Sequence, residues 1–147
     1  MNANDGNILF KDESFAIAGA CFEVHNEMGC GFTEQVYQAC LEIEFASRSI
    51  PFVAQPTLAL VYKGTRVDQS FRPDFLCYDR IIVEIKAIET LADAHRSQVL
   101  NYLNAGQFAL GMLINFGTYP KIQIERLVKS SPSIRVHSRH SRAPSSL

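Results

Sequence analysis

The residues best suited to chemistry lie in the segment RPDFLCYDRIIVEIKAI, residues 72–88, which contains Asp74, Glu84 and Lys86. Side chains alternate between the two faces of a β-strand, so Glu84 and Lys86 share one face if they lie on a strand. Asp74 adds a second carboxylate to that face if the two parts of the segment pair as strands. The segment therefore predicts a carboxylate pair with an amine beside it.

This set of groups is typical of a metal-dependent phosphodiesterase. Two carboxylates and a backbone carbonyl, such as that of Ile85, suit a hard cation such as Mg²⁺ or Mn²⁺. The cation acidifies a bound water and screens phosphate charge, and the ammonium of Lys86 can orient the attacking water. The tripeptide E-x-K alone is more often the solvated face of an amphipathic strand, so this alternative stays open.

The turn between the two strands decides whether the carboxylates meet. A two-residue turn at Asp79-Arg80 would set Asp74 opposite Ile85, on the wrong face of the sheet. A three-residue loop, Tyr78 to Arg80, would instead set Asp74 opposite Glu84. The site hypothesis therefore requires the odd loop.

A second polar group lies in HRSQVLNYL, residues 95–103. His95, Gln98 and Tyr102 are spaced three and four apart, so they project from one face of a helix. Gln98 and Tyr102 could position a phosphate, a sugar or the lysine, whereas His95 is more simply a solvent-facing residue. A polar helix surface with a partly buried tyrosine is the alternative interpretation.

A third candidate is Glu34, in the stretch GCGFTEQVY at residues 29–37. A glutamate in the first turn of a helix is explained by the helix dipole, and Tyr37 is explained by core packing. Beside the carboxylate pair, however, the glycines acquire a purpose, because they turn the chain so that Glu34 can enter the cleft. Gly31 and Tyr37 are then expected to support the site.

The elements that must position these residues follow from apolar periodicity, which predicts an α/β sandwich with strands of mixed direction. Helices are expected at 12–28, 34–48 and 91–104, with Thr33 and Thr90 as N-caps. The expected strands cover 57–62, 65–71, 71–78, 80–88, 108–116 and 121–128, and the first two form a hairpin that turns at Lys63-Gly64.

Composition is that of a globular chain, with 147 residues, 47% hydrophobic and 20% charged. We expect one domain at residues 1–128 and a basic Ser/Arg/His-rich disordered tail at 129–147. No apolar run is long enough for a bilayer and no signal peptide is evident, so a cytoplasmic protein with reduced cysteines is expected.

The charge distribution limits how nucleic acid could be bound. The chain has a net charge of −1, and residues 1–128 alone carry ten basic and fifteen acidic side chains, a net charge of −5. An extended nucleic-acid groove usually needs more positive charge. Five cations of the domain are expected to form only a local basic rim: Lys63, Arg66, Arg72, Arg80 and Arg96.

The sequence resembles a known family. GFTEQVY matches the G-x-x-E-x-x-Y signature of the GxxExxY proteins, which are assigned to the PD-(D/E)XK nuclease superfamily, through Gly31, Glu34 and Tyr37. PDFL, VEIKAI, QVLNYL and GMLINFG extend the likeness over residues 15–127. The resemblance implies a restriction-endonuclease-like αβββαβ core, with a mixed sheet flanked by helices.

The resemblance also implies roles for individual residues. Asp74 and Glu84 occupy the positions of the metal-binding carboxylates, and Lys86 that of the catalytic lysine. Gln98 and Tyr102 are similar to the Q-x-x-x-Y helix motif that positions substrate. Glu34 is similar to an additional acidic residue contributed by an N-terminal helix.

The predicted function is therefore a Mg²⁺- or Mn²⁺-dependent nuclease that cleaves DNA or RNA. The main alternative is a non-catalytic module for nucleic acid or protein on a nuclease fold, which the acidic body favours. A structural or regulatory partner with a merely polar cleft is a third interpretation. The modest size of the chain leaves a homodimer open.

Overall fold

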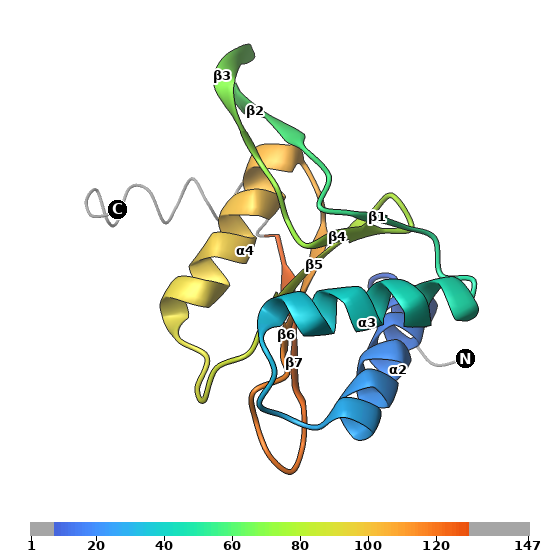
Figure 1. The fold of residues 1–147 in the computed structure, drawn as a ribbon. Helices are drawn as coiled ribbons and strands as arrows, with labels where there is room; N and C mark the ends of the chain where they lie inside the picture. Colours follow the sequence, from blue (N-terminus) through green and yellow to red (C-terminus); the bar gives the residue numbers. More distant parts are fainter. Residues whose placement is uncertain (1–7, 130–147) are drawn as a thin grey trace.

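The computed structural model describes residues 8–129, in which a mixed β-sheet lies between two helices on one side and one helix on the other (Figure 1). The last strand ends at Val128, and the predicted tail at 129–147 lies, apart from Lys129, outside the described residues. Among the described helices, none combines the length and the apolar character that crossing a bilayer requires.

Residues 8–129 form three helices and seven strands. The helices are α2 (Lys11–Met28), α3 (Glu34–Ser47) and α4 (Asp93–Gly106). The strands are β1 (Phe52–Ala54), β2 (Leu58–Tyr62), β3 (Thr65–Phe71), β4 (Phe75–Cys77), β5 (Ile81–Lys86), β6 (Leu110–Asn115) and β7 (Gln123–Val128). The main sheet has the order β1-β4-β5-β6-β7, with β5 and β6 parallel and the other neighbours antiparallel. This arrangement confirms the predicted mixed α/β fold and its restriction-endonuclease-like core.

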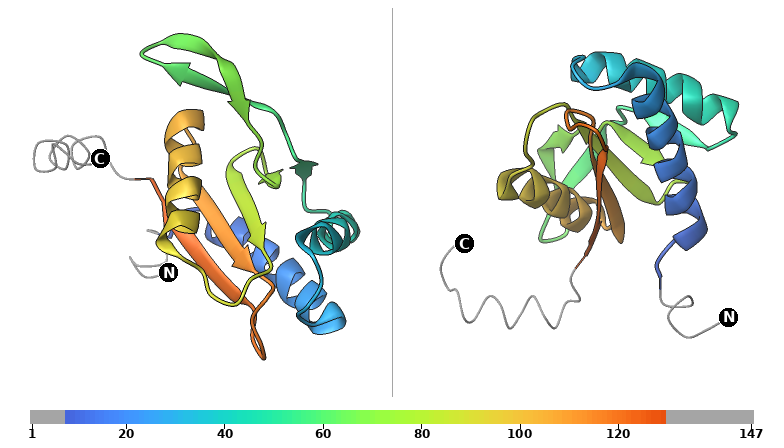
Figure 2. Two further views of the ribbon diagram at one scale, coloured as in Figure 1. Left: turned by 60° about the vertical axis from the view of Figure 1, so that its left-hand side comes forward. Right: turned by 90° about the horizontal axis from the view of Figure 1, so that it is seen from below.

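Alternation along β5 creates two cores, one on each side of the sheet. Val83 and Ile85 pack in the core beneath α2 and α3, whereas Ile82 packs in the core beneath α4. Glu84 has the same parity as Ile82, so its side chain belongs to the α4 side of the sheet. Figure 2 shows α4 on one face of the sheet and α2 and α3 on the other.

The loop between α2 and α3 depends on glycine at two positions. Gly29 ends α2 with φ 74°, and Gly31 follows with φ 112°, conformations that L side chains rarely adopt. The hydroxyl of Tyr37 donates to the Gly29 carbonyl oxygen at 2.5 Å and accepts the Phe32 N–H at 3.3 Å. Tyr37 is fully buried and stacks on Phe116, so it fastens the loop to the core.

The predicted strand at 71–78 is interrupted in the structure. Pairing stops after Phe71 and resumes at Phe75, because Pro73 has no N–H to donate to a ladder. As a result the predicted hairpin of β2 and β3 forms a separate two-stranded sheet. The short edge strand β1, which pairs with β4, has no counterpart in the sequence prediction.

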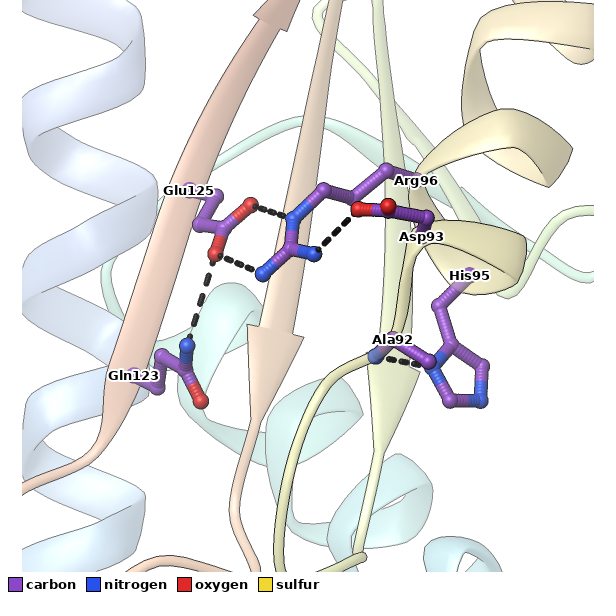
Figure 3. A network of polar contacts seen from close by, with 6 residues as sticks. All are labelled: Ala92, Asp93, His95, Arg96, Gln123 and Glu125. Carbon is purple, nitrogen blue, oxygen red and sulfur yellow. Dashed lines mark hydrogen bonds and ion pairs between the residues drawn. The ribbon is translucent and has the colours of Figure 1, made fainter.

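The N-cap prediction for α4 is wrong. The helix begins at Asp93 after Ala92, rather than at Leu91 after Thr90, and Leu91 is buried in the core beneath α4. The His95 ring accepts the Ala92 N–H through Nδ1 at 2.9 Å, which satisfies a main-chain donor at the helix start (Figure 3). The Thr33 prediction is correct in position, although its side chain makes no capping hydrogen bond.

A bidentate ion pair joins α4 to β7. Arg96 donates to the two carboxylate oxygens of Glu125 at 2.7 and 2.8 Å, and to Asp93 at 3.1 Å (Figure 3). Close approach of α4 to the sheet is made possible by Gly111, where a Cβ atom would lie 2.6 Å from Val99 Cγ1. These contacts determine where α4 lies relative to β5 and β6.

Candidate active site

The β4–β5 connection has the odd length that the carboxylate pair requires. Cys77 is opposite Ile81 and Phe75 is opposite Val83, so the loop contains the three residues Tyr78 to Arg80. Continuing this register by one residue places Asp74 opposite Glu84. The strand pairing therefore meets the condition that the site hypothesis requires.

Three groups of Asp74, its N–H, its carboxylate and its carbonyl oxygen, make hydrogen bonds with neighbouring residues. Its N–H donates to Glu84 Oε1 at 3.1 Å, and its Oδ2 accepts the Ile85 N–H at 2.8 Å. Its carbonyl oxygen accepts the Gln55 N–H at 2.9 Å and the Gln38 side-chain amide at 3.2 Å. The position of Asp74 is therefore determined before any ligand binds.

Glu84 is buried, with only 7% of its surface exposed, which contradicts the alternative that E-x-K is a solvated strand face. Burial, and after it the negative charge of Asp74, raise the pKa of Glu84 to about 7. The Asp74 N–H and the charge of Lys86 act in the opposite direction. Glu84 is thus a carboxylate whose charge the protein alone compensates incompletely.

Asp74 shows the same pattern of effects. Burial raises its pKa above the ordinary value, and the charge of Glu34 adds to this rise, whereas the Ile85 N–H and the Lys86 charge lower it. Glu34 also raises the pKa of Glu84. The charges of Glu34 and Lys86 therefore act on both Asp74 and Glu84, so the four residues form one electrostatically coupled group.

A polar cavity of about 260 Å³ opens where α3 meets the start of β4. Glu34 reaches it from the first turn of α3, whose N-terminal position follows from the tight glycine loop. The lining contains two acids, three amides and one aliphatic residue: Glu34, Asp74, Gln35, Gln38, Gln55 and Ile85. The neutral amides can donate hydrogen bonds to an anionic ligand, and the two acids suit a cation bound together with that ligand.

The sequence interpretation missed three residues of this cavity wall, Gln35, Gln38 and Gln55, of which Gln38 makes the most side-chain hydrogen bonds. Gln38 donates to the Asp74 carbonyl and also to Glu42 at 3.4 Å. The available signal was its position four residues after Glu34, which places both side chains on one helix face. That signal is weak, because glutamine is an ordinary residue on a helix surface.

Gln98 and Tyr102 form a pair on the inner side of α4. Gln98 Nε2 donates to the Tyr102 hydroxyl at 3.0 Å, and the Tyr102 ring stacks on Phe71 with centroids 4.9 Å apart. Burial raises the pKa of Tyr102, and the charge of Glu84 raises it further. The Q-x-x-x-Y residues therefore lie within electrostatic reach of the carboxylates, and Tyr102 remains a neutral phenol.

The donor set fits a hard divalent cation bound by two carboxylates. Asp74 and Glu84 each use one oxygen to accept a main-chain N–H, so both carboxylates are oriented by the strand pair. Mg²⁺ commonly takes one or two protein carboxylates and keeps several waters. Within residues 8–129, no three His, Cys, Asp or Glu side chains are arranged to hold a metal ion together. The fit is therefore to a water-rich site rather than to a closed protein cage.

The predicted basic rim is not assembled as expected. Arg96 is occupied by Glu125 and Asp93, and Arg80 lies over the Phe10 ring at 5.5 Å. The three remaining cations, Lys63, Arg66 and Arg72, are exposed on or beside β2 and β3.

Comparisons with known proteins bear on the family and on the fold. Residues 11–127 match the family model described as the PD-(D/E)XK nuclease superfamily. Among solved structures, the chain is similar to SSO0001, known from a crystal structure, with 15% identity and a TM-score of 0.52, over 76% of this chain and 60% of that protein. At this identity the likeness shows the fold alone, and the comparison with curated proteins gave no match. Because the family match extends over most of the chain, the protein belongs to the PD-(D/E)XK nuclease superfamily.

Proposed function

We propose that the protein is a metal-dependent nuclease that hydrolyses phosphodiester bonds of nucleic acid, and that it is a GxxExxY member of the superfamily. One observation carries the proposal: the three-residue loop sets half-buried Asp74 opposite buried Glu84, so that two carboxylates with raised pKa values lie beside Lys86. Buried acids in such an arrangement are costly unless a cation compensates them, and strong pKa shifts of this kind concentrate at functional sites.

Asp74 and Glu84 are the proposed ligands of Mg²⁺ or Mn²⁺, with the Ile85 carbonyl oxygen and Glu34 as further oxygen donors. The cation, when bound, supplies an acidified water and screens the phosphate charge. Lys86 shares the strand face of Glu84, so its ammonium can hold the attacking water in line with the scissile bond. Its positive charge also stabilises the negative charge that develops on the phosphate.

Gln98 and Tyr102 are the proposed positioning residues. A hydrogen bond between them fixes both side chains of α4 on the side of the sheet to which the Glu84 side chain also belongs. The raised pKa of Tyr102 keeps its hydroxyl protonated, so it can donate to a phosphate oxygen of the substrate strand. Gln98 holds the phenol in the required orientation.

A non-catalytic module on the same fold is the second candidate. Two observations favour it: the net charge of −5 over residues 1–128, and the absence, within residues 8–129, of three metal-ligating side chains already arranged around one point. Such a module would bind nucleic acid or protein at the same cavity without cleaving it.

The two candidates are separated by cleavage assays with labelled single- and double-stranded DNA and RNA in Mg²⁺ or Mn²⁺. Wild type is compared with Glu84→Gln and Lys86→Met, which preserve side-chain size, and with Glu27→Gln, an exposed carboxylate on α2. Cleavage by wild type and Glu27→Gln but not by the other two supports the nuclease. Binding without cleavage in either metal would establish the module instead, and cleavage that survives both site variants would point to a contaminant.

A further inference from the structure

The β2–β3 hairpin extends away from the main sheet as a separate arm. We define the arm as residues 58–72, which include β2, its turn, β3 and Arg72. In Figure 1 and in the left view of Figure 2 it projects at the end of the molecule opposite the β6–β7 connection. Its base is anchored by Phe71, which stacks on Tyr102, and Arg72 stands two residues before Asp74. The arm therefore leads directly to the candidate active site.

The arm is positively charged on an otherwise acidic domain. It contains Lys63, Arg66 and Arg72 against a single acid, Asp68, and has a net charge of +2. The rest of residues 1–128 carries seven basic and fourteen acidic side chains, a net charge of −7. All three cations are exposed, so an approaching polyanion meets attraction at the arm and repulsion elsewhere on the domain.

Apolar and aromatic side chains are exposed beside these charges. Tyr62 is 64% exposed and Val61 is 54% exposed, and the Lys63 ammonium lies 5.5 Å from the Tyr62 ring centroid. Charged residues on an edge strand can serve merely to prevent aggregation. That explanation does not account for an exposed tyrosine and valine at the same tip, because they would favour aggregation rather than oppose it.

The turn of the arm contains a residue poorly suited to its conformation. Lys63 and Gly64 have φ values of 49° and 79° between the paired residues Tyr62 and Thr65, as in a type I′ turn. Asparagine, aspartate or glycine is preferred at the first of these positions. A lysine with positive φ therefore indicates that its charge serves a purpose other than forming the turn.

We propose that the arm binds single-stranded nucleic acid and guides it to Asp74 and Glu84. The inference rests on the proposed function, because it supplies the substrate strand to the same carboxylates. Three exposed cations can neutralise phosphates of a bound strand, and the exposed Tyr62 ring offers a stacking surface that only unpaired bases can use fully. A duplex would contact the cations but leave the ring unused.

The test measures binding of a short labelled oligothymidylate, and of a matched duplex, to the full chain in EDTA, where metal-dependent cleavage is excluded. The arm variants are Lys63→Asn/Arg66→Gln and Tyr62→Ser. The matched control is Lys121→Asn, an exposed lysine in the β6–β7 connection. Every variant keeps the basic residues from 129 onward, so differences in binding come from the substituted sites.

We expect the double variant to weaken single-strand binding by about tenfold at low salt and to reduce the salt slope by about 1.4. Tyr62→Ser should weaken it by about fivefold, whereas Lys121→Asn should leave it unchanged. Lys63→Asn alone should preserve or raise the melting temperature, because asparagine suits the turn. A loss of binding without a loss of stability is the signature of a binding role.

The arm proposal is overturned if the double variant binds as wild type does, or if duplex binds as tightly as single strand and Tyr62→Ser has no effect. Failure of the proposed function is visible separately. Arm-dependent binding without cleavage in Mg²⁺ or Mn²⁺ removes the nuclease and keeps the arm. Cleavage that is unaffected by the arm variants keeps the nuclease and removes the arm.

Discussion

Asp74 and Glu84 are joined by a hydrogen bond of 3.1 Å from the Asp74 N–H to Glu84 Oε1, just beyond the last paired residues of β4 and β5. The Asp74 carboxylate in turn accepts the Ile85 N–H at 2.8 Å. Each carboxylate thus accepts a main-chain N–H of the other strand, as a carbonyl oxygen would in a regular β-ladder. Site geometry and strand register are therefore linked, because neither carboxylate can move without breaking a main-chain hydrogen bond.

The first prediction concerns the register that produces this relationship. Deleting Leu76, with the three-residue loop kept, places Asp74 opposite Val83 instead of Glu84, on the other face of the sheet. We expect cleavage to disappear and the melting temperature to fall. The measurement is nuclease activity together with thermal unfolding.

Asp79→Gly is the control for this deletion. Asp79 has φ 57°, a conformation that glycine adopts easily, so this substitution should keep both the register and activity. Activity in the deletion variant equal to wild type would show that the register is not required.

The second prediction uses the burial of Glu84. Its pKa is raised from 4.5 to about 7, so in the metal-free protein the folded state loses stability as pH rises from 4.5 towards 7, and the full loss persists above 7. Glu84→Gln removes this charge and should stabilise the metal-free protein by about 2 kcal/mol at pH 8, with no gain near pH 4. Unfolding in urea at the two pH values, in EDTA, checks this.

The same unfolding experiment is repeated with metal added. Mg²⁺ or Mn²⁺ should stabilise wild type at pH 8 more than it stabilises Glu84→Gln, because a ligand that binds the folded state raises its stability. Equal stabilisation of the two proteins would place the cation elsewhere.

The sequence predicted those features that depend on strong local patterns. The helices that begin near residues 12 and 34, and the buried strand that contains Gly111, have long apolar repeats that leave few alternatives. For Asp74 and Glu84, the sequence predicted only a requirement. Because side chains alternate between the faces of a strand, the two carboxylates share a face only if the loop between the strands has an odd number of residues. The roles of the site residues stay predictions.

Other features depend on tertiary contacts that no local pattern contains. The arm leaves the main sheet because Pro73 interrupts pairing and Phe71 packs on Tyr102 of α4. Arg96 was expected in the basic rim, but its partner Glu125 is 29 residues away in the sequence. Gln38 contacts Asp74 across 36 residues. Contacts at such separations are decided by packing rather than by propensity.

The third prediction concerns the close contact between α4 and β6. Gly111→Ala places a Cβ atom 2.6 Å from Val99 Cγ1, so either the Val99 side chain or α4 itself must shift, and a shift of α4 carries Gln98 and Tyr102 with it. We expect a loss of about 1–3 kcal/mol in the free energy of unfolding, together with reduced cleavage.

Gly19→Ala is the matched control, because its added Cβ meets only the flexible end of Arg48, at 3.2 Å. Within helix α2 this change should be neutral or stabilising by up to about 1 kcal/mol. A Gly111→Ala protein as stable as wild type would show that this contact does not position α4.

The final prediction separates the two side chains of the G-x-x-E-x-x-Y signature. Tyr37→Phe removes the bonds to the Gly29 carbonyl and the Phe32 N–H while keeping the ring that stacks on Phe116. It should cost about 1–2 kcal/mol of stability and leave cleavage within a few-fold of wild type at temperatures where both are folded.

Glu34→Gln should instead lower cleavage and not stability, because Glu34 is half-buried at the cavity and raises the pKa values of both Asp74 and Glu84. Removing its charge relieves repulsion in the metal-free protein, so its stability should be unchanged or higher, while metal-dependent cleavage should fall. Urea unfolding and cleavage rates of the two variants, measured side by side, decide the assignment. If Tyr37→Phe abolished cleavage at unchanged stability, the tyrosine rather than the glutamate would carry the chemistry of the signature.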